Sequence, residues 1–236
     1  MNKILILGKK SFIAGNLFKY LRKKNLIVFK DFNEIKNNTK SFFSSFDYII
    51  NCSIDIDYIN LRYKIKNDKD YLIAKKIKDL KVKQIIFSTR KIYKFKLNCK
   101  EGDTKKPKCN YSKNKLKTEK NIKGLLKKKL LIFRVSNIIG LTKNSFKKKH
   151  KTFIDIFFQN IKKNIIFENE KNFKDFVHIK KFCEIVELSI NNGIYGAYNL
   201  SIGKKIYLNK LVNWLNTYNK NKKKIKLFKR LDTDSF

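Results

Sequence analysis

Several residue types and patterns that would assign a function class directly are scarce in this 236-residue chain. Its four cysteines form no Cys-x-x-Cys pair and have no metal-like spacing with the two histidines, so no metal site is expected. We expect free thiols in a reducing cytosol, which predicts a cytoplasmic location. No apolar run reaches about 18 residues, so no membrane span is expected. The apolar part of the N-terminus is too short for a signal peptide and is typical of a strand.

Acidic residues are also scarce, with 19 Asp and Glu against 57 Lys and Arg and a formal net charge of +38. Such a charge suggests nucleic-acid binding, but only five of the basic residues are Arg, whose bidentate fork suits bases and phosphates. The lysines run along the whole chain, together with abundant Asn, Ile, Phe and Tyr. Genome bias towards A/T-rich codons explains this pattern, and a polyanion-binding surface is the alternative. We expect no nucleic-acid partner, but an attraction for anionic ligands such as nucleotides.

The chain does have a strand, a glycine turn and a helix at its start. Ile4–Leu7 is an apolar run that ends at Gly8, as expected for a buried parallel strand. An amphipathic helix follows, and a dinucleotide pyrophosphate binds at the N-terminus of such a helix. The full fingerprint has glycine at positions 8, 11 and 14, where this chain has Gly8, Ser11 and Ala14. Ser11 replaces the glycine that lets the backbone approach phosphate, so an ordinary strand–helix turn is the alternative.

Three further apolar runs are predicted strands: Leu26–Phe29, Tyr48–Ser53 and Ile85–Thr89. Asp31 lies where an NAD enzyme binds the adenosine ribose, and Lys30 could instead meet the 2′-phosphate of NADP. The cofactor choice therefore stays open, with solvated loop charges as the alternative. Residues 33–46 leave room for a helical turn or two, and helical periodicity runs from residue 61 to residue 80. Thr89 ends a strand where ligands gather, although a strand-capping threonine is the alternative.

Tyr111 and Lys115 have the spacing of an acid/base pair. Residues four apart share one face of a helix, and a neighbouring ammonium is expected to lower the tyrosine pKa from about 10 towards working pH. The spacing alone says little, because Tyr20, Tyr71 and Tyr218 also have lysine four residues on. Position distinguishes Tyr111, since it opens a helix after the strand that ends at Thr89.

The alternation of elements up to residue 140, which includes a strand over Leu130–Val135, predicts a parallel sheet with right-handed crossovers. Beyond residue 141 the pattern changes. The predicted elements there are a basic loop over 143–151, helices around 153–161, 182–188 and 208–215, and strands over 165–167 and 196–200. We therefore predict a dinucleotide-binding core over 1–140, and a small mixed α/β substrate-binding region over 141–236 that is interleaved with the core.

Taken in order, these motifs resemble the extended short-chain dehydrogenase/reductase family, which includes NAD-dependent epimerase/dehydratases and dTDP-4-dehydrorhamnose reductase-like enzymes. The resemblance covers nearly the whole chain. It rests on the Gly8 turn, on Tyr111 with Lys115 and Glu119, and on the segments 47–51, 87–93, 134–140, 175–179 and 198–200. It implies an α/β fold with a Rossmann-like doubly wound parallel sheet and a small C-terminal substrate-binding region.

The resemblance also implies roles for residues. Thr89 would bind the substrate oxygen, Tyr111 would be the general acid/base, and Lys115 would hold the nicotinamide ribose. The cofactor-binding residues would be Gly8, Ser11, Phe12, Ile13, Asp31, Cys52, Ser53, Lys115 and Asn137. Asp175 and His178 match a motif that is expected to organise the substrate-binding region.

The implied activity is that of an NAD- or NADP-dependent reductase or epimerase acting on a nucleotide-activated sugar, in polysaccharide biosynthesis, with a homodimer as the usual assembly. Arg90 and Lys91 stand where dehydratases carry an acid beside the threonine, which favours reductase or epimerase. Ser11 and a chain shorter than most members motivate a second hypothesis, a cofactor-binding member without turnover that acts as a regulator or scaffold. Charge alone motivates a third, a nucleic-acid-associated protein on the same fold.

Overall fold

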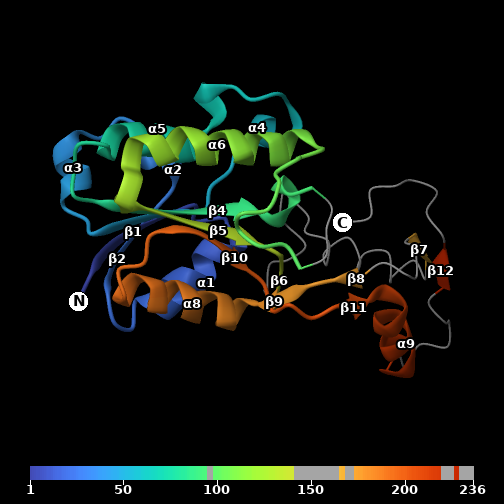
Figure 1. Cartoon of the computed structure of the whole chain (residues 1–236). Helices are drawn as coiled ribbons and strands as arrows, with labels where there is room; N and C mark the ends of the chain where they lie inside the picture. The colour runs from blue at the N-terminus through green and yellow to red at the C-terminus, as the bar shows by residue number, and fades with distance from the viewer. Residues whose placement is uncertain (95–97, 141–164, 168–172, 219–225, 229–236) are drawn as a thin grey trace. The chain divides into compact units, whose positions relative to one another are not determined.

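A six-stranded parallel sheet forms the centre of one of two compact units in this protein. The structure is a computed structural model, and it describes residues 1–94, 98–140, 165–167, 173–218 and 226–228. The first unit comprises Met1–Val135 and Ile179–Leu200, and the second comprises Ser136–His178 and Ser201–Phe236. The chain therefore leaves the first unit after β5 and returns to it at α8 (Figure 1).

The strands of the sheet are β1 (Lys3–Leu7), β2 (Leu26–Lys30), β3 (Tyr48–Asn51), β4 (Lys83–Thr89), β5 (Leu130–Val135) and β10 (Gly196–Leu200). Their order is β10-β5-β4-β3-β1-β2, and every neighbouring pair is parallel. This arrangement confirms the predicted α/β fold with a Rossmann-like doubly wound sheet. The run over 196–200 was predicted within the C-terminal region, and the structure places it in this same sheet beside β5.

The direction in which the chain crosses the sheet reverses at β1. β2 lies on one side of β1, and β3, β4, β5 and β10 follow on the other side. In open α/β sheets, ligands bind outside the carboxyl ends of the strands at such a switch point. The residues that follow these strand ends are Gly8 after β1 and Cys52 after β3.

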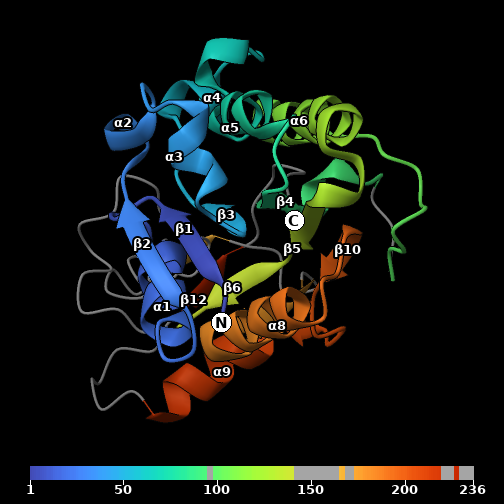
Figure 2. The same ribbon diagram turned by 90° about the vertical axis from the view of Figure 1, so that its left-hand side faces the viewer.

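Helices cover both faces of this sheet. Figures 1 and 2 show α5 (Lys69–Ile77) and α6 (Asn110–Leu126) on one face, and α1 (Phe12–Leu21) and α8 (Ile179–Asn191) on the other. Residues 4–7 of β1 are consequently fully buried. A strand that is covered on both faces has an uninterrupted apolar sequence rather than an alternating one, which is why this run is recognisable. No helix within the described ranges is long and apolar enough to cross a membrane.

The periodicity between residues 61 and 80 corresponds to two elements rather than to one helix. These are the 3₁₀ turn η1 (Ile65–Asn67) and α5, and the short helix α4 (Ile56–Asn60) precedes them. Asp68 begins α5, because its carboxylate accepts a hydrogen bond from Tyr71 N at 3.0 Å and so caps the helix. The segment 33–46 holds two short helices, α2 (Phe32–Ile35) and α3 (Lys40–Ser44), as predicted. The remaining 3₁₀ turns of this unit are η2 (Arg90–Ile92) and η3 (Lys127–Lys129).

The second unit contains three small two-stranded sheets among its described residues. The strand pairs are β6 (Asn137–Ile139) with β9 (Phe176–His178), β8 (Phe173–Lys174) with β11 (Ile206–Tyr207), and β7 (Ile165–Phe167) with β12 (Lys226–Phe228). Helix α9 (Leu208–Tyr218) follows β11. The basic loop over 143–151 and the helix over 153–161 lie outside the described residues. The substrate-binding role of this unit remains a prediction.

A buried ion pair joins the first unit's helix α6 to its sheet. Arg134 Nη2 on β5 lies 2.8 Å from Glu119 Oε2 on α6, and both side chains are 6% exposed. Ser88 Oγ on β4 donates to Glu119 Oε1 at 2.5 Å. Arg134 Nη1 donates to Tyr93 Oη, which in turn donates to Asn199 Oδ1 on β10, both at 2.7 Å. One network therefore fastens α6 to three neighbouring strands.

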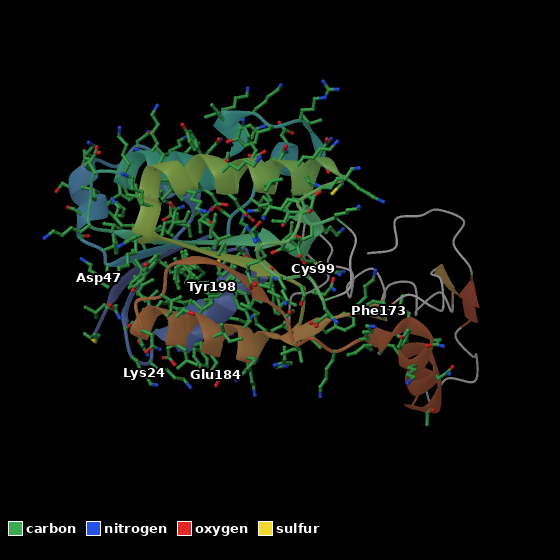
Figure 3. All side chains as sticks on the ribbon, viewed as in Figure 1. Lys24, Asp47, Cys99, Phe173, Glu184 and Tyr198 are labelled. Atoms are coloured by element: carbon green, nitrogen blue, oxygen red, sulfur yellow. The ribbon has the colours of Figure 1, made fainter. Side chains whose placement is uncertain are left out.

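We predict that Glu119→Ala lowers the free energy of unfolding by about 3–5 kcal/mol in urea titrations, because it leaves the Arg134 guanidinium buried without its partner. The matched control is Glu184→Ala. Glu184 lies on α8 (Figure 3) and pairs with Lys181 at 3.1 Å, with its side chain 44% exposed. Its loss should cost less than about 1 kcal/mol. Equal losses in the two variants would contradict the assigned role of the buried pair.

Candidate active site

The glycine turn after β1 lies close to the carboxyl end of β3. Gly8 has φ +105°, and a Cβ added to it would lie 3.0 Å from Ser53 N and 3.1 Å from the Cys52 carbonyl carbon. Cys52 N donates to Leu7 O at 2.9 Å, which holds the two strand ends together. Only glycine combines this φ with such a close backbone approach. The structure therefore brings together Gly8, Cys52 and Ser53, three of the predicted cofactor-binding residues.

Helix α1 begins directly after this turn. Ser11 is its N-cap, and the Ser11 hydroxyl accepts a hydrogen bond from Ala14 N at 3.4 Å. Phe12 and Ile13 form the first helical residues. The positive end of the helix dipole thus lies at the carboxyl end of β1, where an anionic group is favoured. The side chain that departs from the glycine fingerprint serves as a helix cap here.

The end of β2 carries the residues that were predicted to meet the adenosine. Asp31 Oδ1 accepts a hydrogen bond from Lys9 N at 2.8 Å, which ties the end of β2 to the glycine turn. Glu34 pairs with Lys9 at 2.9 Å and with Lys30 at 3.3 Å. The Asp31 backbone N–H and the two ammonium groups lower the pKa of Glu34 to about 2. Lys30 and Asp31 therefore lie beside the glycine turn, next to the ion pairs that Glu34 makes with Lys9 and Lys30.

Ser88 and Thr89, at the end of β4, have different hydrogen-bond partners. Both side chains are buried. The Ser88 hydroxyl donates to Glu119, whereas Thr89 Oγ1 accepts a hydrogen bond from Lys91 N at 3.2 Å and caps the turn that follows. Successive strand residues point to opposite faces of a sheet. Thr89 is thus the hydroxyl at this strand end that is not bound to the buried carboxylate.

Lys115 differs from almost every other lysine of the chain because it is buried. Among the described residues, Lys115 and Lys174 are the only buried lysines. Lys115 Nζ lies 3.1 Å from Asp70 Oδ2 and 5.5 Å from the centre of the Tyr58 ring. Lys24 and Lys75, the partners in two of the other tyrosine–lysine spacings, are exposed. The fourth, Lys222, lies outside the described residues. Burial therefore distinguishes Lys115 from Lys24 and Lys75, which the four-residue spacing alone did not do.

Asp70 is the site residue that sequence reasoning missed. It precedes Ile73, Ala74 and Ile77 at helical spacing, and all four side chains are buried on one face of α5. An acid at the first position of an apolar i, i+3, i+4, i+7 stripe was the available signal. Such an acid has to be buried with a partner.

Tyr111 is partly buried at the start of α6, one turn before Lys115. Burial raises the pKa of its phenol, the Lys115 ammonium lowers it, and Asp70 and Cys109 raise it further, so the net shift is upward. The expected direction of the shift was therefore wrong. The physical reason is that the lysine charge is already matched by the Asp70 carboxylate, while desolvation disfavours the phenolate.

Asn137 lies in the second unit and is engaged there. Its backbone N–H and its side-chain Nδ2 donate to Asp175 O at 3.2 and 2.9 Å. The Asp175 carboxylate accepts hydrogen bonds from Ser136 Oγ, Ile202 N and Gly203 N. These bonds tie three chain segments of this unit together, which is an organising role. The cofactor-binding role of Asn137 remains a prediction.

A basic hollow of about 670 Å³ lies beside the end of β2. Phe32 and Leu72 contribute apolar surface, and Asp55 is its one acid. The cations that line it are Lys36, Lys40, Lys66, Lys69, Lys75 and Lys76. Its electrostatic potential favours anions. Within the described residues, no cluster of His, Cys, Asp and Glu could hold a metal ion.

No family model and no curated protein sequence matches this chain. Solved structures do match it. UDP-N-acetylglucosamine 4-epimerase from Methanobrevibacter ruminantium, in complex with UDP-N-acetylmuramic acid, is similar with a TM-score of 0.77 and 16% identity, over 98% of this chain and 85% of that one. dTDP-4-dehydrorhamnose reductase from Yersinia enterocolitica gives a TM-score of 0.76 and 17% identity, over 98% and 84%.

A third similar structure is TunA, an NAD-dependent NDP-hexosamine 5,6-dehydratase involved in tunicamycin biosynthesis. It gives a TM-score of 0.78 and 15% identity, over 98% of this chain and 84% of that one. At such identities the likeness is one of fold. The structural neighbours are extended short-chain dehydrogenase/reductases, and this chain has their fold.

Proposed function

We propose that this protein is an NAD- or NADP-dependent oxidoreductase or epimerase that acts on a nucleotide-activated sugar. The observation that carries the proposal is the burial of Lys115 one helical turn after Tyr111. Composition bias explains exposed lysines, but a buried ammonium is costly and is retained only with specific partners. Tyr111 and Lys115 lie on the helix that packs against β4, the strand that ends at Thr89.

The carboxyl ends of β1 and β3 fit a dinucleotide. Gly8 provides the close backbone approach, and the ten-residue helix α1 presents its N-terminus there. The cap formed by Ser11 uses the Ala14 N–H but leaves the strand–turn–helix geometry intact. The similar dehydratase TunA is NAD-dependent, which supports a nicotinamide cofactor for this fold.

The proposed chemistry divides between the cofactor and the chain. When bound, the nicotinamide supplies or accepts the hydride. In reduction, Tyr111 Oη donates its proton to the carbonyl oxygen, and Thr89 Oγ1 donates a hydrogen bond to the same oxygen. In oxidation, a Tyr111 phenolate removes the hydroxyl proton. Lys115 would hold the nicotinamide ribose. Proton transfer from a positioned side chain contributes about 10²–10⁴-fold to the rate.

A nucleotide sugar is the proposed substrate class because the similar epimerase and reductase are named for UDP- and dTDP-linked sugars. The basic surface suits the diphosphate of such a molecule. A cytoplasmic homodimer with a role in polysaccharide biosynthesis remains a prediction.

A second candidate is a protein that binds the cofactor without turnover. The observation that favours it is Ser11, whose side chain stands where glycine would admit phosphate and whose hydroxyl occupies a helix N–H.

We predict that Tyr111→Phe lowers kcat for NADH-dependent conversion of a nucleotide sugar by at least about 10²-fold, because the proton donor is lost. The affinity for NADH, measured by its fluorescence, should be nearly unchanged. Tyr20→Phe is the matched control, since Tyr20 also has lysine four residues on, and it should keep full activity. Cofactor binding without turnover in the unmodified protein would support the second candidate instead.

We also predict that Gly8→Ala destabilises the protein by about 1–3 kcal/mol and weakens NADH binding, because the new methyl group would press against the backbone at Ser53. Gly15→Ala is the control, because nothing lies within 4 Å of its added Cβ. Alanine in that helix should add up to about 1 kcal/mol to the free energy of unfolding and leave NADH binding unchanged. Urea titration and NADH fluorescence measure both effects, and equal behaviour of the two variants would contradict the role of Gly8.

A further inference from the structure

Both carboxylate oxygens of Asp70 are bound inside the protein. Oδ2 lies 3.1 Å from Lys115 Nζ, and Oδ1 accepts a hydrogen bond from Asn51 Nδ2 at 2.7 Å. The two ionic side chains are 6% and 8% exposed. Asn51 Oδ1 in turn accepts from Ser53 N and Ser53 Oγ, at the end of β3. Asp70 is thus held by a strand end on one side and binds the lysine on the other.

This arrangement changes what Tyr111 experiences. A lone ammonium would stabilise the phenolate, but an ammonium paired with a carboxylate presents little net charge. Burial, Asp70 and Cys109 together outweigh Lys115 and raise the pKa of Tyr111. Burial alone would lower the pKa of Lys115, yet Asp70 and the neighbouring phenols raise it overall, so the lysine stays charged.

We propose that Asp70 is a positioning residue that acts as the counter-ion of Lys115 and keeps Tyr111 protonated, so that the site is set to reduce a carbonyl rather than to oxidise an alcohol. This inference rests on the proposed function. In the step it favours, the Tyr111 proton moves to the carbonyl oxygen while the carbonyl carbon gains a hydride, which a bound reduced nicotinamide would supply as it is oxidised. The phenolate then regains a proton from water.

The other titratable groups around the pair do not supply this charge. Burial raises the pKa values of the Cys52 thiol and the Tyr58 phenol, so both are neutral near pH 7. Asp68 is bound by Thr118 Oγ1 and Tyr63 Oη rather than by Lys115. The groups facing the pair or Tyr111 are Tyr58 from α4, Cys52 after β3, Asp68 at the start of α5, and Cys109 before α6.

The test is the titration of Tyr111 in the full-length protein labelled with ¹³Cζ-tyrosine and followed by NMR, with the resonance assigned by Tyr111→Phe. In the unmodified protein Tyr111 should titrate above the range of exposed tyrosines. Asp70→Asn should lower its midpoint by about one unit or more, and Asp70→Glu should restore it. Asp68→Asn removes an equally buried acid that does not touch Lys115, so it should leave the Tyr111 midpoint unchanged.

An unchanged Tyr111 midpoint in Asp70→Asn, or an equal shift in Asp68→Asn, overturns the proposal. If Asp70→Asn does not fold, ¹⁵N NMR of the unmodified protein decides. The Lys115 ammonium, assigned by Lys115→Arg, should persist at a pH where exposed lysines deprotonate, and titration together with those lysines overturns the proposal. None of these titrations needs cofactor or substrate, so their outcome is separate from failure of the proposed function. If turnover is found, the alkaline fall of the reduction rate should move to lower pH in Asp70→Asn by the same shift.

Discussion

Helix α6 can lie against its neighbours only because each charge on its buried face has a partner. Removing an ammonium or a carboxylate from water costs several kcal/mol, which a close counter-ion offsets. Lys115 finds Asp70 on α5, and Glu119, one turn further, finds Arg134 on β5. The helix is therefore fixed from two sides by ionic contacts. The contacts that hold α6 in place therefore also fix its first turn, which carries Tyr111.

The strands that are covered on both faces could be predicted from the sequence. An uninterrupted apolar run such as Ile4–Leu7 indicates a buried strand even when its neighbouring strands are unknown. The start of a new helix at Asp68 was not predicted. The spacing of apolar residues continues across this position and does not reveal that Asp68 caps a helix there. The place of β10 was missed for a related reason: an apolar run does not encode which strand it will pair with. In the site, positions at strand ends were predictable. The contact between Asp70 and Lys115 spans 45 residues, and the direction of the Tyr111 shift depends on it.

Composition and burial carry different kinds of information in this chain. With 57 basic residues, most lysines mark only the surface, and patterns built on lysine arise by chance. A buried lysine is different, because an ammonium group inside the protein needs specific partners, and codon bias does not provide them. The same reasoning applies to acids: with only 19 of them, burying Asp68, Asp70, Glu119 and Glu187 commits a notable share of a scarce residue type to the interior of the first unit.

The detour of the chain between β5 and β10 has a consequence for biosynthesis. β5 is made long before its neighbour, since the ribosome must first add residues 136–178 and α8. During that interval β5 is an edge strand whose outer N–H and C=O groups are unpaired, and such edges recruit strands from other chains. At roughly 5–20 residues per second the interval lasts several seconds. The exposed edge of β5 therefore makes the nascent protein prone to aggregate after its first five strands are made and before β10 emerges.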